Sequence, residues 1–374
     1  MTTEPIGIYV HTPFCIKKCN YCDFCSFPIS DFEKREEYIK ALILEIASYG
    51  GREITVDSVF FGGGTPSLLR PEEIKKIVCE LKHSFQILPD AEFTLEANPK
   101  TVSEENLLLY RELGVNRISI GLQSIHENEQ KMLGRTHNFD DFLTSYELVR
   151  ASGISNVNVD LMYGIPEQTL DSFEKTLRRV LALSPEHISL YGLILEEDTP
   201  LFSLHRQNRL TLPTEDEECD MYSLAARILA EAGYSHYEIS NYARVGYECR
   251  HNLKYWNNME YIGVGVSAYS NFGNRRYGNS RDISEYISDY SLKYDVTESD
   301  AETERYDYVM LGLRLKDGIS LSEYKKRFSS DFIMENEEQI NSFLSGGFMQ
   351  ISGDRLSLTE RGFYVSNTIL TALL

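Results

Sequence analysis

Residues 9–27 read YVHTPFCIKKCNYCDFCSF and hold four of the seven cysteines in the chain of 374 residues. Cys15, Cys19 and Cys22 stand in a C-x3-C-x2-C spacing, and Cys25 follows at one further C-x2-C step. A short apolar run just before this stretch predicts a buried strand. So many thiols directly after a strand indicate a ligand-binding segment, and the rest of the chain is interpreted around it.

Three kinds of chemistry compete for these thiols. Disulfides are disfavoured, because the first strand begins directly after Pro5 without an apolar export signal, and cytosolic thiols are normally reduced. A zinc site usually pairs C-x2-C with a second, distant pair of Cys or His ligands. No such pair is obvious in this sequence, although Cys249 and His251 are candidates. The third is an iron–sulfur cluster held by three thiolates, with one iron left open. We expect a cytoplasmic protein with such a cluster.

A helix is the structural alternative for the same stretch. Offsets of four and seven residues would place three small side chains on one helical face. Pro13, just before the first Cys, and Asn20 and Asp23 among the others instead favour a loop that wraps a ligand.

Composition limits the partners. Apolar residues at 42% and charged residues at 25% are ordinary for a globular protein. The 37 Lys and Arg against 57 Asp and Glu give a net charge of −20, which repels phosphate backbones, so no nucleic-acid partner is expected. No apolar run approaches the roughly 18 residues that span a bilayer, so we expect no integral membrane segment and at most peripheral contact.

Strands and helices alternate through residues 1–235, which predicts an α/β domain. Apolar runs predict six strands, at residues 6–10, 56–61, 91–96, 116–121, 155–163 and 187–193. This alternation implies parallel βαβ units, whose ligands lie at the C-terminal ends of the strands. It fits a partial (β/α)6 barrel.

Two further regions follow the barrel. Residues 236–300 are interpreted as a connecting region. Residues 301–374 predict helices and a hairpin, a winged-helix-like pattern that often binds DNA. Because acidic residues such as Asp331 and Glu335 crowd this part, we expect a lid or interface domain over the barrel mouth.

The pattern Y-x-H-x-P-F-C-x3-C-x-Y-C-D-F, which begins at Tyr9, resembles the signature of the radical S-adenosylmethionine (SAM) enzymes. The resemblance is to the branch of the oxygen-independent coproporphyrinogen III oxidases. It implies that Cys15, Cys19 and Cys22 carry a 4Fe-4S cluster whose open iron chelates the amino and carboxylate groups of SAM.

The same resemblance implies SAM contacts at the strand ends. The glycine motif Gly62-Gly63-Gly64-Thr65, which follows the second predicted strand, would bind the amino group of SAM. Glu96 and Asp160 would contact the ribose, Gln123 the nucleoside, and Arg135 the carboxylate, as a forked guanidinium can. Each residue alone also fits an ordinary turn or solvated rim. Four polar residues at successive strand ends exceed what a barrel rim requires. The predicted SAM contacts are Tyr9, Gly63, Gly64, Thr65, Glu96, Gln123, Arg135 and Asp160.

A second informative stretch contains Cys249, His251, Tyr255 and Trp256, the last being the only Trp of the chain. Aromatic faces suit a flat macrocycle, and heme iron accepts His or Cys. Residue chemistry alone favours a hydrogen-bonded structural His251. The H-N-x-x-Y-W segment is nevertheless similar to that of the HemW-like heme chaperones, which implies heme as cargo and His251 as a heme contact.

Two departures from the oxidase pattern agree with the chaperone branch: Phe24 replaces a Cys, and only a short segment precedes the first strand. A third difference limits the resemblance. Many chaperones read Gly-Ala-His-Ser where this chain has Tyr269 in place of the His, so no heme contact is carried over there.

The resemblance therefore predicts a heme chaperone that delivers heme to apo-hemoproteins. The alternative is an enzyme, a coproporphyrinogen III oxidase (dehydrogenase) that begins by hydrogen abstraction. Whether copies of the chain form a homodimer is open, and Cys25, Cys79 and Cys219 have no predicted role.

Overall fold

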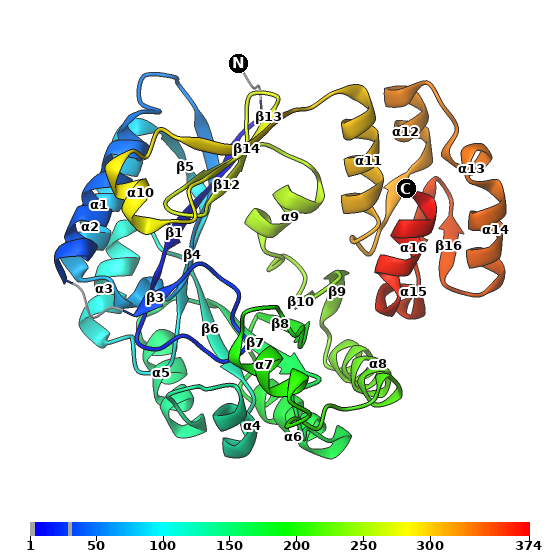
Figure 1. Cartoon of the computed structure of the whole chain (residues 1–374), viewed down its shortest axis with the longest axis horizontal. Helices are drawn as coiled ribbons and strands as arrows, with labels where there is room; N and C mark the ends of the chain where they lie inside the picture. The colour runs from blue at the N-terminus through cyan, green and yellow to red at the C-terminus, as the bar shows by residue number, and fades with distance from the viewer. Residues whose placement is uncertain (1–3, 29–31) are drawn as a thin grey trace.

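A computed structural model describes residues 4–28 and 32–374 and places the six expected strands side by side in one curved sheet (Figure 1). These strands are β1 (Ile6–Thr12), β4 (Thr55–Gly63), β5 (Gln86–Ala97), β6 (Arg117–Gln123), β7 (Asn156–Tyr163) and β8 (His187–Gly192). Each pairs in parallel with the next. The predicted partial (β/α)6 barrel is confirmed.

Amphipathic helices cover the outer face of the sheet. They are α1 (Phe32–Ala47), α2 (Pro71–Ser84), α3 (Glu104–Leu113), α4 (Glu127–Met132), α5 (Phe139–Ala151) and α6 (Leu170–Leu181). In α2, for example, Ile74, Ile77, Val78 and Leu81 are buried, at the spacing of one helical face. The sheet is covered on both sides, which is why every residue of β6 is buried.

The sheet is wider than the sequence indicates. In the described residues it has twelve strands, and both additional edges come from residues 235–298. One edge adds β11 (Tyr261–Val264), β12 (Tyr269–Asn271), β13 (Arg275–Asn279) and β14 (Lys293–Glu298) beside β1. The other adds β10 (Asn241–Ala243) and β9 (Ser235–Glu238) beside β8. The region interpreted as a connection therefore belongs largely to the barrel sheet.

Four further helices link or flank these strands. They are α7 (Pro200–Arg206), α8 (Glu215–Glu231), α9 (Arg250–Trp256) and α10 (Ile283–Ser288). Within the described ranges, no helix combines the length and apolar character needed to cross a membrane.

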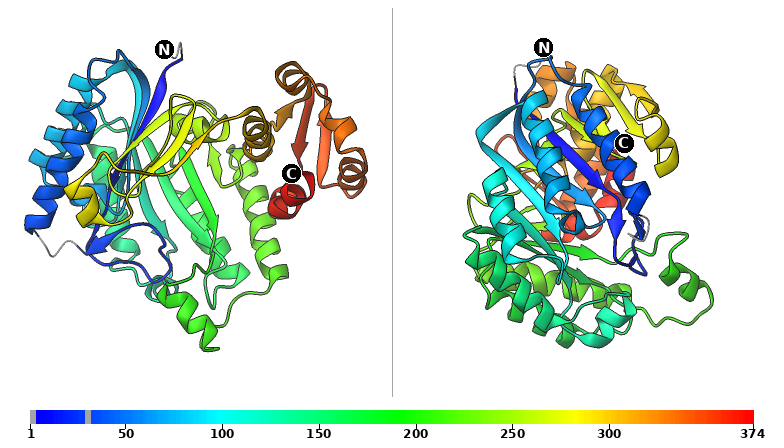
Figure 2. Two further views of the ribbon diagram at one scale, coloured as in Figure 1. Left: turned by 45° about the horizontal axis from the view of Figure 1, so that its top comes forward. Right: turned by 90° about the vertical axis from the view of Figure 1, so that its left-hand side faces the viewer.

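The C-terminal domain has a hydrophobic core of its own and packs beside α8 (Figure 2). Its elements are α11 (Ala301–Gly312), β15 (Ile319–Ser320), α12 (Leu321–Phe328), α13 (Phe332–Glu335), α14 (Glu337–Ser345), β16 (Met349–Ser352), β17 (Arg355–Leu358), α15 (Glu360–Tyr364) and α16 (Ser366–Leu373). Val309 of α11 and Leu313 just after it are buried, whereas Tyr306 is 47% exposed. Tyr222 of α8 completes this core.

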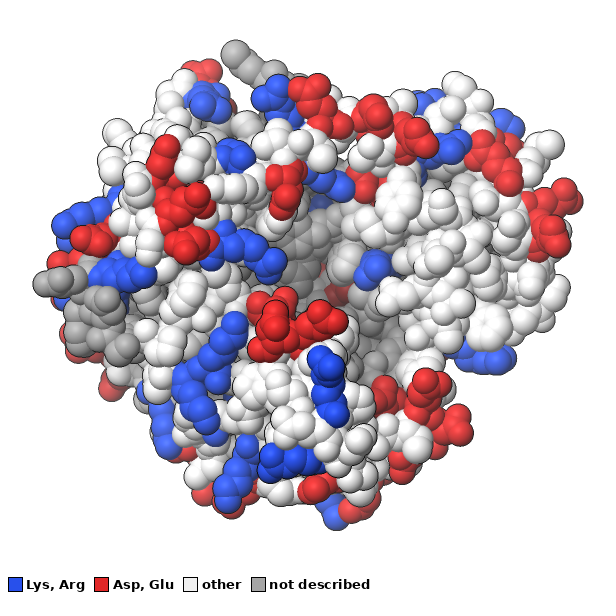
Figure 3. All heavy atoms as spheres, viewed as in Figure 1, with Lys and Arg blue, Asp and Glu red and all other residues white. Residues whose placement is uncertain are grey.

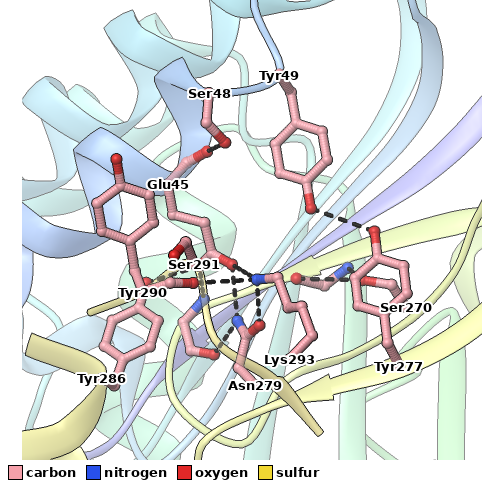
Figure 4. Close-up of polar contacts among 12 residues, drawn as sticks. Glu45, Ser48, Tyr49, Ser270, Tyr277, Asn279, Tyr286, Tyr290, Ser291 and Lys293 are labelled. Atoms are coloured by element: carbon pink, nitrogen blue, oxygen red, sulfur yellow. Dashed lines mark hydrogen bonds and ion pairs between the residues drawn. The ribbon is translucent and has the colours of Figure 1, made fainter. Parts of the chain in front are cut away.

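A buried carboxylate fastens the β11–β14 edge to α1 (Figure 4). Glu45 is 1% exposed. It accepts hydrogen bonds from Lys293 Nζ at 2.7 Å, Asn279 Nδ2 at 2.8 Å, Tyr286 Oη at 2.7 Å and the Gly265 N–H at 2.7 Å. A buried charge is tolerated only when it is paired and hydrogen-bonded, so this network fixes where β12 and β13 lie.

We expect Glu45→Gln to lower the free energy of unfolding by about 3 kcal/mol, because it leaves the Lys293 ammonium without its buried partner. Urea denaturation measures this loss. Glu37→Gln is the matched control, since Glu37 is exposed on the same helix and should change stability by less than about 0.5 kcal/mol. Equal unfolding midpoints for the two variants would show that the network contributes nothing.

Candidate functional site

Residues 13–27, the cluster loop, leave β1 and return beside it without forming a helix. The loop begins with β2 (Phe14–Cys15) and runs into β3 (Phe27–Pro28), which pairs with β2 in parallel. The Phe27 N–H donates to Pro13 O at 2.6 Å and closes the loop at its base. The prediction that these residues form a loop is confirmed, and the helical alternative is wrong.

The glycines that follow β4 allow the cluster loop to lie directly against the sheet. The Gly64 N–H donates to Thr12 O at 2.7 Å, and the Thr65 N–H donates to Phe14 O at 2.8 Å. A Cβ at position 64 would lie 2.7 Å from Phe14 O, and one at position 63 would lie 2.5 Å from the His11 ring. Only glycine permits these approaches, so the motif first of all positions the loop.

Cys15, Cys19 and Cys22 line a common cavity of about 280 Å3. Burial raises the pKa of the Cys15 and Cys22 thiols, so both are protonated until a metal binds. In the described residues, no three His, Cys, Asp or Glu side chains converge on a point where one metal ion would sit. The three thiols share one cavity, as the predicted iron–sulfur cluster requires.

The cavity lies at the C-terminal ends of the barrel strands, as expected for a ligand site in this fold. Seven of the eight predicted SAM contacts line it, namely Gly63, Gly64, Thr65, Glu96, Gln123, Arg135 and Asp160. Tyr9 does not; its side chain lines a neighbouring pocket.

Two of these residues carry polar atoms that lack a partner among the described residues. Gln123 has a left-handed backbone (φ 72°), and its buried Oε1 accepts no hydrogen bond. The buried Nε of Arg135 donates none, although Arg135 Nη1 lies 3.5 Å from Cys19 Sγ. Buried polar atoms are rarely left unpaired, so this cavity fits a polar ligand such as SAM beside the cluster.

Two carboxyl groups, those of Glu96 and Asp160, line the cavity. Burial, reinforced by the nearby Asp160 charge, raises the pKa of Glu96 to about 8. Burial also raises the pKa of Asp160, while Asn158 Nδ2 donates to its Oδ1 at 2.6 Å. Both carboxyl groups are suited to hydrogen bonds with hydroxyl groups, because neither forms an ion pair among the described residues.

Asn98 and Tyr191 are among the cavity residues that sequence analysis missed. Asn98 Nδ2 donates to Thr65 Oγ1 at 2.7 Å, and Asn98 Oδ1 accepts from Arg135 Nη2 at 2.7 Å, so Asn98 orients both predicted contacts. Tyr191 lines the cavity from the end of β8. Both follow the rule that strand ends carry the site, and Asn98 stands only two residues after Glu96.

Beside this cavity lies a second, more open one of about 360 Å3, the tyrosine pocket. It is lined by Tyr9, His11, Asp23, Phe24, Cys25, Tyr255, Tyr261, Ser267, Tyr269 and Arg281. Phe24 is 65% exposed and lines both cavities. The cluster loop therefore has one cavity on each side.

His251 lines neither cavity. It is 1% exposed and packs on β1, where a Cβ at Gly7 would lie 3.0 Å from its ring. Its Nδ1 is hydrogen-bonded to Ser58 Oγ at 3.0 Å and its Nε2 to Tyr255 Oη at 2.8 Å. Burial lowers the pKa of His251 to about 3, so the ring is neutral. An iron ligand here would have to break one of these bonds, and the visible role of His251 is to orient Tyr255.

The other cysteines outside the cluster motif have separate surroundings. Cys249 is buried and donates to Glu92 Oε1 at 3.4 Å, and burial raises its pKa to about 12. Cys79 is exposed, and Cys219 is partly exposed on α8. Cys25 donates to Arg281 O at 3.4 Å.

No residue from 301–374 lines either cavity, so the C-terminal domain does not act as a lid in this structure. The domain packs against α8 and α9. It is also joined to the residue after β9, where the Ile239 N–H donates to Arg314 O at 2.9 Å.

Figure 3 shows a hollow near the middle of one face, with acidic side chains along its lower edge.

Family comparisons agree with this geometry. Residues 9–180 match the model described as the radical SAM superfamily, and residues 300–365 match the HemN C-terminal domain. A solved structure of coproporphyrinogen III oxidase (HemN) from Escherichia coli superimposes with a TM-score of 0.86 at 24% identity, over 99% of this chain and 90% of that one. The fold is thus that of a radical SAM protein, a class that uses a 4Fe-4S cluster and SAM.

Curated relatives define the family more narrowly. Heme chaperone HemW of Lactococcus lactis is 32% identical over 100% of this chain and 98% of its own length. The Bacillus subtilis protein of that name is 34% identical, with 98% of each chain covered, and the Escherichia coli one 32%, with 99% and 98% covered. The chain belongs to the HemW family.

We expect Cys19→Ser to abolish the visible absorption and iron content of the anaerobically reconstituted protein, because one of three cluster ligands is lost. Cys79→Ser, which changes an exposed thiol on α2, should retain both. Iron content equal to wild type in Cys19→Ser would contradict the assignment of Cys19.

The raised pKa of Glu96 predicts a pH-dependent stability of the protein without cofactors. At a pH between the ordinary pKa of a glutamate and about 8, the Glu96 carboxyl is protonated in the folded state and ionised in the unfolded state. The free energy of unfolding therefore falls as pH rises through this window, by at most about 1.4 kcal/mol per unit. Glu96→Gln removes the effect, so its stability relative to wild type should increase from about pH 5 to about pH 8.5 in urea denaturation. Glu105→Gln is the control, because Glu105 is exposed and its stability relative to wild type should not depend on pH. If the difference in stability between Glu96→Gln and wild type were also independent of pH, the prediction would be refuted.

Proposed function

We propose that this protein is a heme chaperone that binds heme and hands it to apo-hemoproteins in the cytoplasm. The observation that carries this proposal is the similarity, over the whole chain, to proteins named heme chaperone HemW. A shared domain alone would support less, because the same superfamily fold hosts many activities.

We propose that Cys15, Cys19 and Cys22 hold the 4Fe-4S cluster. Arg135 would bind the SAM carboxylate, while Glu96 and Asp160 would accept the ribose hydroxyls and Gln123 would contact the nucleoside. The unpaired Gln123 Oε1 and Arg135 Nε support these roles. Cluster and SAM together supply one-electron radical chemistry when bound. The part of the protein is to bind and orient SAM through these side chains.

Phe24 favours heme handling over porphyrinogen oxidation. The oxidases carry a Cys at this position, and a thiol there can exchange a proton or hydrogen atom beside the cluster. The exposed phenyl ring of Phe24 can do neither, but it offers an apolar surface to a macrocycle. Apo-hemoproteins as the acceptors of heme stay a prediction, and so does a homodimer of the chain.

The test is an anaerobic heme titration of cluster-loaded protein, followed by addition of apomyoglobin as acceptor. We expect a saturable shift of the heme absorption band and then transfer of heme to apomyoglobin. In parallel, coproporphyrinogen III, SAM and a reductant are added, and we expect no protoporphyrinogen IX. Formation of protoporphyrinogen IX without saturable heme binding would establish the oxidase instead.

A further inference from the structure

The proposed function leaves open where heme binds, since His251 is enclosed in the core. The tyrosine pocket offers a site, and the inference below rests on the proposed function. With about 360 Å3, this pocket lies in the range of ligand sites for small molecules. It shares Phe24 of the cluster loop with the cavity assigned to SAM.

The inner wall of the pocket is aromatic and rigid. The rings of Tyr255 and Tyr261 meet edge-to-face with centroids 4.6 Å apart. Tyr9 stacks on Phe60 with centroids 6.2 Å apart, and Tyr255 is held from behind by His251. Such a wall presents apolar ring faces and edges to a flat ligand without having to rearrange.

One phenol on the rim has surroundings that suit metal ligation. Tyr269 on β12 is 45% exposed and lines the pocket. Its ring lies over Gly278 of β13, where a Cβ would come within 2.9 Å of it. Its Oη donates to Asp295 Oδ2 at 2.6 Å. A phenol that already donates to a carboxylate has an acceptor for its proton when a metal replaces that proton.

The pocket also offers a cation for an anionic ligand. Arg281 lines it, and among the described residues no ion pair ties its guanidinium to a carboxylate. Lys18 belongs to the cluster loop, where its Nζ donates to Phe24 O at 3.0 Å. Heme carries two propionate groups, and a guanidinium binds carboxylates through paired hydrogen bonds.

We propose that the tyrosine pocket binds heme, with Tyr269 Oη as axial ligand of the ferric iron and Arg281 paired with a propionate. Tyrosine is an established axial ligand of heme iron. In the ligation step the Tyr269 O–H bond breaks, its proton passes to the Asp295 carboxylate, and an Oη–Fe(III) bond forms. The iron keeps its oxidation state, so the step requires no oxidant or reductant.

Ferric heme titrated into the cluster-loaded full chain tests this assignment by optical and resonance Raman spectroscopy. We expect an iron–phenolate vibration in wild type, and its loss together with at least a tenfold weaker affinity in Tyr269→Phe. Tyr294→Phe is the matched control: Tyr294 is 40% exposed on the neighbouring β14, does not line the pocket, and should leave spectrum and affinity unchanged. Asp295→Asn should weaken the phenolate signal while retaining the phenol.

The outcomes separate this inference from the proposed function. If wild type binds heme but Tyr269→Phe keeps the same spectrum and affinity, the ligand assignment is overturned and the chaperone proposal stands. A ligand signature that disappears in Cys25→Ser instead would likewise overturn it. If wild type binds no heme at all, the proposed function fails and the inference with it. Unchanged cluster absorption in every variant excludes misfolding as the cause.

Discussion

The structure depends on the close approach of the cluster loop to the end of β4. Two backbone hydrogen bonds hold it there, from the Gly64 N–H to Thr12 O and from the Thr65 N–H to Phe14 O. A side chain at position 64 would overlap the backbone of the loop. Because of this contact, the three cysteines face the strand ends that carry the predicted SAM contacts. The loop also becomes a thin wall, with one cavity on each side.

The second informative segment is tied to the first through the barrel. Asn158 donates to Asp160 in the cluster-side cavity, and Asn158 Oδ1 is hydrogen-bonded to His187 Nδ1 at 2.6 Å. His187 Nε2 is bonded to Tyr237 Oη at 2.8 Å, and this oxygen accepts from the Cys249 N–H at 3.1 Å. A buried polar chain therefore links the predicted SAM contacts to the start of α9, which supplies Tyr255 to the tyrosine pocket.

Local patterns sufficed for the barrel, and they predict a site at its strand ends, because these ends converge in a parallel sheet. The individual residues of the cavity came from the resemblance to the radical SAM enzymes. Local patterns failed where distant segments pair. The β11 strand joins β1 across some 250 residues, and no period in the sequence marks that partner. For the same reason the sequence does not reveal that Tyr9, a predicted SAM contact, lines the tyrosine pocket. In the sequence, Phe24 and Tyr269 stand out only because they differ from the residues of related proteins. The fold was needed to show that Phe24 lines both cavities and that Tyr269 lines the tyrosine pocket.

The central claim is that SAM and heme occupy opposite sides of one loop, and the distance between cluster and heme tests it most directly. Reduced 4Fe-4S cluster and ferric heme are both paramagnetic, so electron paramagnetic resonance of the doubly loaded protein reports their separation. The account predicts that bound heme strongly accelerates the relaxation of the cluster signal, because the two cavities share Phe24 of the cluster loop. A cluster signal whose relaxation is identical with and without stoichiometric heme would place the heme elsewhere and contradict the account.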